Sequence, residues 1–158
     1  MIGLYLDEFA AGQRIELGQH VFAAEAIKRF ARQFTPVGFH MDADEAAQGL
    51  FAKPSAAGWH ICCGWMVCFV ESNSKERARH AASGKVLPEI GPSPGLSALR
   101  WPNPVYPDDA ISYGLTVTAK RDLKSRPNWG LVTFLADGFH AARGQVLSFE
   151  GKVLVARR

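Results

Sequence analysis

A histidine stands in the most irregular stretch of the first half of the chain. His40 follows Pro36 and Gly38, which both interrupt helices, and it precedes Asp42, a residue type that commonly caps a helix. Imidazole titrates near neutral pH, so a histidine held in such a loop is a candidate for acid–base chemistry. The alternative is that His40 is an ordinary loop histidine, and its position alone leaves both interpretations open.

A glycine opens the most apolar segment of the chain. Gly58 falls in the first turn of a helix predicted over about residues 55–71. The first N–H groups of a helix have no partner within it, and they point outward at the positive end of the helix dipole. Without a Cβ, such a position lets a carbonyl approach the N–H, which can stabilise the enolate-like oxygen formed when a conjugated thioester is attacked. Alternatively, Gly58 only permits close packing against a strand.

Two shorter helices are expected to position His40. Apolar residues at i, i+3, i+4 and i+7, starting from Ile27, predict an amphipathic helix that begins near Ala23 and ends before Pro36. Asp42 followed by Glu45 resembles a capping box and predicts a second helix over residues 43–50. His40 should therefore lie in the loop between them.

The helix over residues 55–71 is apolar on nearly all sides, which is typical of a helix enclosed by the rest of the fold. Residues 72–94 are polar at first and then rich in Gly and Pro, so we expect a long loop there. Loops of this length in compact domains are often functional. This loop could cover whatever binds between His40 and Gly58.

The second half of the chain predicts strands. Apolar and polar residues alternate from Ile111 to Lys120, the period of a half-buried strand. Further strands are expected at residues 14–21, 96–101, 129–136 and 145–155. Helices followed by antiparallel strands indicate an α+β fold. With one enclosed helix, the pattern favours a hot-dog fold, an antiparallel sheet wrapped around a long central apolar helix, in one domain over residues 1–158.

Composition limits the classes of partner. The 18 Lys and Arg against 15 Asp and Glu give a net charge of only +3, and no dense basic stripe suggests nucleic acid. Cys62, Cys63 and Cys68 lack zinc spacing and are predicted as core residues in a reducing compartment. The longest apolar segment, residues 56–70, is shorter than the roughly 20 residues of a membrane span. A cytoplasmic protein without a membrane or nucleic-acid partner is expected.

The helical half resembles the hydratase signature of the MaoC-like dehydratase family, which includes the (R)-specific enoyl-CoA hydratases. That signature usually reads Phe-Ala, then Asp-x-x-Pro-x-His-x-Asp, then a small-residue glycine turn that opens the central helix. Phe30-Ala31, residues 35–42 and Ala57-Gly58 carry the likeness here. The strand boundaries of the second half, such as Pro104-Val105, are similar in order, so the resemblance covers nearly the whole chain.

The resemblance implies reversible hydration of trans-2-enoyl-CoA thioesters. In the family, an Asp and a His orient and deprotonate water, while a backbone N–H polarises the thioester oxygen. No metal or redox cofactor takes part. The family's histidine falls on His40 and its oxyanion-hole glycine on Gly58. The site usually forms at or beside a dimer interface, so the implied partners are an acyl-CoA or enoyl-CoA thioester and further copies of the chain, in a homodimer or a higher hot-dog oligomer.

The chain departs from the family at its catalytic aspartate, which falls on Thr35. A threonine hydroxyl can hold water but cannot take its proton near neutral pH. Three interpretations follow. His40 can act alone as the base with Thr35 orienting water; the protein can be a thioesterase; or it can be catalytically silent, binding acyl-CoA or pairing with an active homologue.

Two further groups are candidates for substrate binding. His60 stands near the start of the apolar helix, where it can line the acyl pocket or bond within the core. Lys124, Ser125 and Arg126 form a small basic cluster that can meet the phosphates of CoA or can simply end a strand.

Overall fold

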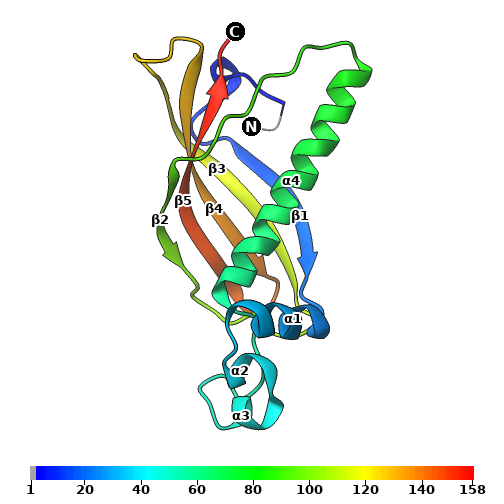
Figure 1. Ribbon diagram of the computed structural model, residues 1–158. Helices are drawn as coiled ribbons and strands as arrows, with labels where there is room; N and C mark the ends of the chain where they lie inside the picture. The colour runs from blue at the N-terminus through cyan, green and yellow to red at the C-terminus, as the bar shows by residue number, and fades with distance from the viewer. Residues whose placement is uncertain (1–2) are drawn as a thin grey trace.

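The computed structural model describes residues 3–158. Four helices, five strands and a short 3-10 turn at Leu6–Glu8 make up the fold (Figure 1). The helices are α1 (Ala24–Phe34), α2 (Gly38–Met41), α3 (Ala43–Ala47) and α4 (Gly58–Ala82). The strands are β1 (Arg14–Val21), β2 (Gly95–Arg100), β3 (Ala110–Asp122), β4 (Trp129–His140) and β5 (Gly144–Ala156).

The five strands form one antiparallel sheet in the order β1-β3-β4-β5-β2. The long helix α4 lies along one face of this sheet, and α1, α2 and α3 gather at the end where α4 begins (Figure 1). This confirms the predicted α+β hot-dog fold.

The contact between α4 and the sheet is aromatic. Trp65 stacks on Phe134 with ring centroids 5.9 Å apart and meets Phe149 edge to face at 5.0 Å. Its Nε1 donates to the carbonyl of Gly114, 3.1 Å away, and the Tyr113 hydroxyl donates to the helix carbonyl of Ile61 at 2.9 Å. These bonds satisfy the polar ends of two large buried side chains and so fix how α4 sits across the strands.

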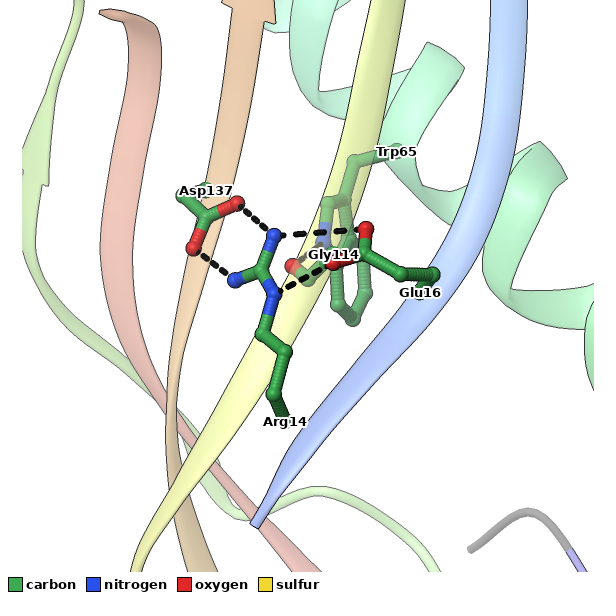
Figure 2. Close-up of polar contacts among 5 residues, drawn as sticks. All are labelled: Arg14, Glu16, Trp65, Gly114 and Asp137. Carbon is green, nitrogen blue, oxygen red and sulfur yellow. Dashed lines mark hydrogen bonds and ion pairs between the residues drawn. The ribbon is translucent and has the colours of Figure 1, made fainter. Parts of the chain in front are cut away.

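On the opposite face of the sheet, an ion cluster joins β1 to β4 across β3 (Figure 2). Arg14 of β1 reaches across β3 to Asp137 of β4, where Nη2 donates to Oδ1 at 2.9 Å, and its Nε donates to Glu16 at 2.9 Å. Gly114 lies beneath the guanidinium, and a Cβ there would overlap it. The glycine therefore allows a charged pair to bind β1 to β4 across the intervening strand.

The helix α4 is longer than the sequence pattern predicts. Residues 72–94 were expected to be a loop, but α4 continues to Ala82 and only residues 83–94 are largely irregular. The extension is polar; Glu76 forms an ion pair with Arg79 at i+3, and its carboxylate lies 3.8 Å from Nε2 of His80 at i+4. Such pairs support a helix that does not need an apolar face.

One face of α4 stays exposed, which corrects the expectation of a helix enclosed on all sides. Trp59, Met66, Val67 and Val70 are between 42% and 56% exposed. The cysteines divide in the same way: Cys68 is buried, Cys62 is partly buried and Cys63 is exposed, so the prediction that all three lie in the core is wrong for Cys63. The sheet covers one face of the helix only. Within residues 3–158, no helix has the length and apolar character to cross a membrane.

Candidate active site

His40 lies in the one-turn helix α2, where a loop was predicted. The turn forms because the N–H of Asp42 donates to the carbonyl of Gly38 at 2.8 Å. The imidazole is buried, and its Nδ1 lies 2.7 Å from the carbonyl oxygen of Ser55. Since a carbonyl only accepts, Nδ1 must carry the proton. The other ring nitrogen, Nε2, is left with a lone pair that can take a proton from a substrate or water.

Gly58 is the first residue of α4, and its N-cap residue Ala57 has no side chain that could accept a hydrogen bond. The first backbone bond of the helix runs from the N–H of Ile61 to the carbonyl of Ala57, at 3.1 Å. The N–H groups before it, including that of Gly58, therefore have no acceptor within the helix. They form a cluster of donors at the positive end of the helix dipole.

Close packing is a second reason for a glycine at this position. A Cβ on Gly58 would lie 2.6 Å from the ring of Trp101, the residue that follows β2. The indole thus rests directly on the helix start. The missing Cβ of Gly58 permits this packing, while its backbone N–H is a separate group that can donate to a ligand. The two roles proposed for Gly58 are therefore compatible.

His40 and Gly58 line the same cavity, which has a volume of about 200 Å³. Its other walls come from Ile61 of α4, from the segment before α4 (Phe51, Ser55 and Ala56) and from the segment after β2 (Trp101, Pro102, Asn103 and Pro104). These two segments are tied together by the N–H of Ala56, which donates to the carbonyl of Val105 at 2.7 Å. Apart from His40, Ser55 and Asn103, the lining side chains are apolar, so the cavity combines a base, a helix start and little competing polarity.

Asn103 is a cavity residue that the sequence reasoning missed. Its Nδ2 donates to the carbonyl of Gln145 at 2.8 Å, which fixes the orientation of the amide. The Oδ1 atom then remains as an acceptor that can hold a water molecule. The only signal in the sequence is its position between Pro102 and Pro104, a pattern that indicates a rigid turn and nothing more.

Thr35 is not among the residues that line this cavity. It is the C-cap of α1, and its backbone N–H donates to Ala31 at 2.9 Å. The Oγ1 atom is buried and has no hydrogen-bond partner within the described part of the chain. The structure therefore brings two of the three predicted catalytic residues together and leaves the third outside their cavity.

No family model matches the chain. A crystal structure of a MaoC-like dehydratase from Rhodospirillum rubrum is 34% identical to it, with 99% of each chain covered and a TM-score of 0.82. The chain belongs to the MaoC-like dehydratase family. The protein YdeM of Bacillus subtilis is 26% identical over 152 residues, 96% of this chain and 99% of that protein. The (R)-hydratase PhaJ1 of Pseudomonas aeruginosa shares the fold at 22% identity and a TM-score of 0.66, with 99% and 88% of the two chains covered.

In this MaoC-like protein, His60 packs in the core rather than on the cavity wall. Its ring is stacked on Phe30 with centroids 4.6 Å apart and meets Phe22 edge to face at 5.1 Å. Burial, with smaller effects from the charges of His20 and Arg29, lowers the pKa of His60 from about 6.5 to about 4. His60 is therefore neutral in the folded protein at neutral pH.

We expect His60→Phe to reduce the loss of stability on acidification. Because the folded protein lowers the pKa of His60, the unfolded chain takes up a proton first as the pH falls below about 6.5. The contribution of His60 to the free energy of unfolding is therefore fully present above pH of about 6.5 and is lost as the pH falls toward about 4. Free energies of unfolding near pH 7 and near pH 5 should therefore differ less in the variant. An equal difference in the two proteins would contradict this role for His60.

The three predicted CoA-phosphate residues lie elsewhere in the MaoC-like chain. Lys124, Ser125 and Arg126 are exposed in the turn between β3 and β4. In Figure 1 this turn is at the end of the sheet opposite to α1–α3. The 13 residues of β3 span roughly 40 Å at about 3.3 Å each, so within one chain the cluster and the cavity are far apart. Their contact with CoA stays a prediction.

Proposed function

We propose that this MaoC-like protein reversibly adds water to a trans-2-enoyl-CoA thioester. The observation that carries the proposal is that His40, with Nε2 free to accept a proton, and the first amide of α4, at Gly58, line one cavity. A base and an oxyanion donor in the lining of one small, mostly apolar cavity are what conjugate addition to a thioester requires.

In the proposed reaction, the thioester carbonyl accepts a hydrogen bond from the N–H of Gly58. Water lies between Nε2 of His40 and Oδ1 of Asn103. As the water oxygen bonds to C3 of the substrate, His40 takes its proton, and the C2–C3 π electrons move to the thioester oxygen. The helix-start amide stabilises that enolate. The imidazolium then returns the proton to C2, which restores the neutral imidazole and completes the addition of H and OH.

The resemblance implies that Thr35 replaces the family's catalytic aspartate, so the proposed mechanism has a single base, His40. A general base commonly contributes 10²–10⁴-fold, so the protein should be slower than a relative that has both groups. The loss also supports the alternative that the chain is a catalytically silent acyl-CoA-binding protein or partner subunit. A thioesterase is less supported, because among the described residues no carboxylate lines the cavity to activate water for attack on the carbonyl.

Turnover of crotonyl-CoA by the purified protein decides between these functions. A hydratase removes the absorbance of the conjugated thioester without releasing thiol. Release of free CoA would instead indicate a thioesterase. Binding without either change would indicate the silent protein and would refute the hydratase proposal.

We expect Thr35→Asp to raise the rate of hydration. The change returns a carboxylate to the position that the resemblance implies for the family's catalytic aspartate, five residues before His40, from where it must reach the cavity that Thr35 itself does not line. A gain of about 10-fold or more in kcat is expected, within the range for one general base. Thr35→Asn, which cannot take a proton, is the matched control. If the aspartate variant folds and is no faster than the asparagine variant on enoyl-CoA esters of several lengths, Thr35 is not the missing catalytic position.

We further propose that the protein acts as a homodimer. Among residues 3–158, the outer strands of the sheet, β1 and β2, each have one edge without a partner strand, which favours pairing with another chain. The exposed apolar side chains of α4, such as Trp59 and Met66, are also unusual for the surface of a monomer. A mass of about one chain, 17.3 kDa, in light scattering would contradict the proposal.

A further inference from the structure

A second cavity lies along the same stripe of α4 as Gly58. Gly58, Cys62 and Met66 follow one another at four-residue intervals, so they share one side of the helix. Cys62 and Met66 line a cavity of about 150 Å³ between α4 and the sheet. Its walls are almost wholly apolar and include Phe69, Leu96 and Val153. Met66 is eight residues from Gly58, or about 12 Å along the helix.

Trp101 lies at the Gly58 end of this stripe of α4. Its indole lines the cavity of His40 and packs so tightly on Gly58 that a Cβ there would be 2.6 Å away. Cys62, which lines the second cavity, is one helical turn beyond Gly58 on the same side of α4. Trp59 meets Trp101 edge to face, with centroids 5.7 Å apart. A chain leaving the reaction cavity along α4 would meet this ring first.

We propose that Trp101 sets the length of acyl chain that the protein accepts, by closing the reaction cavity against the apolar cavity beyond it. The inference rests on the proposed function, because it assumes that the thioester lies at Gly58. With the indole in place, about 200 Å³ is available, which is below the 300–1,000 Å³ typical of ligand sites. Removing the ring would join this space to the apolar cavity and open room for a longer chain.

The test is equilibrium binding of S-alkyl-CoA thioethers with chains from ethyl to decyl, measured by calorimetry on the full chain. These compounds have no carbonyl and cannot be turned over. Trp101→Ala and Trp101→Phe are compared with the wild type. Trp59→Ala is the matched control, because Trp59 is an exposed tryptophan that contacts Trp101 but lines neither cavity. Since Trp101 is itself 40% exposed, its removal should leave the fold intact.

In the wild type and in Trp59→Ala, affinity should stop rising after a short alkyl chain. In Trp101→Ala it should continue to rise by about fourfold for each further methylene that becomes buried. Trp101→Phe should fall between them. If the chain-length dependence of Trp101→Ala matches that of the wild type, or if no thioether binds to any of the proteins, the role of Trp101 is refuted.

Crotonyl-CoA turnover by the same preparations separates this inference from the proposed function. A wild type that is inert toward crotonyl-CoA, with a longer chain preference in Trp101→Ala, would refute the hydratase and support the length limit. An active wild type, with the same chain preference in Trp101→Ala as in the wild type, would support the hydratase and refute the length limit.

Discussion

Replacing His40 by asparagine is expected to lower kcat for enoyl-CoA hydration by about 10²–10⁴-fold, with little change in KM. The substitution removes Nε2, the only ring nitrogen free to accept a proton, because Nδ1 is engaged with the carbonyl of Ser55. An asparagine amide can occupy the place of Nδ1 and still donate to Ser55. The loss should therefore be in chemistry, while the melting temperature stays close to that of the wild type.

The matched control for this variant is His140→Asn. His140 has its Nδ1 near the N–H groups of Ala142 and Arg143, at 3.1 and 3.2 Å, and it does not line the cavity. An asparagine oxygen can accept from the same groups, so kcat should be unchanged. A His40→Asn protein that folds and retains more than about a tenth of wild-type kcat would show that His40 is not the base.

Removing the N–H of Gly58 is expected to lower kcat by about 10²–10³-fold, the usual effect of losing one oxyanion donor. Gly58→Pro removes this donor at a position where proline suits a helix, since Gly58 is the first residue of α4. The preceding residue, Ala57, already has φ −62° and ψ 144°, which a following proline permits.

The contact with Trp101 must be controlled in this experiment, because any Cβ on Gly58 meets that ring. Both Gly58→Ala and Gly58→Pro should therefore be made in a Trp101→Ala background. In both double variants the Trp101→Ala change removes the ring that a Cβ at residue 58 would overlap. The two proteins then differ in the backbone N–H, which the alanine variant retains and the proline variant lacks. Equal kcat values in the two double variants would refute the oxyanion role of the Gly58 amide.

The sheet and the buried face of α4 were predictable because their signals are local. Alternation from Ile111 onward matches β3, and the apolar run before residue 71 matches the helix that covers the sheet. The polar extension of α4 to Ala82 was not predictable from hydrophobicity, since it has no apolar face to mark it. Charge pairs such as Glu76 with Arg79 stabilise it instead. Their i, i+3 spacing is a helix signal, but the prediction of a loop over residues 72–94 rested on polarity and on the Gly and Pro residues.

For the site, a helix break and a helix start 18 residues apart drew attention to His40 and Gly58, and the resemblance to the MaoC-like signature was needed to assign them roles. Asn103 and Trp101 could not, because they come from a distant segment. Their position depends on the way in which the segment after β2 pairs with residues before α4, through Ala56 and Val105. Such contacts depend on the order and register of the strands, which cannot be derived from a single sequence.

The most direct test of the central claim is a crystal structure of the protein with a bound acyl-CoA analogue. We predict that the thioester oxygen lies about 3 Å from the backbone nitrogen of Gly58. The carbon that receives water should face Nε2 of His40. A thioester that binds with good density but with its carbonyl away from the start of α4 would contradict the account.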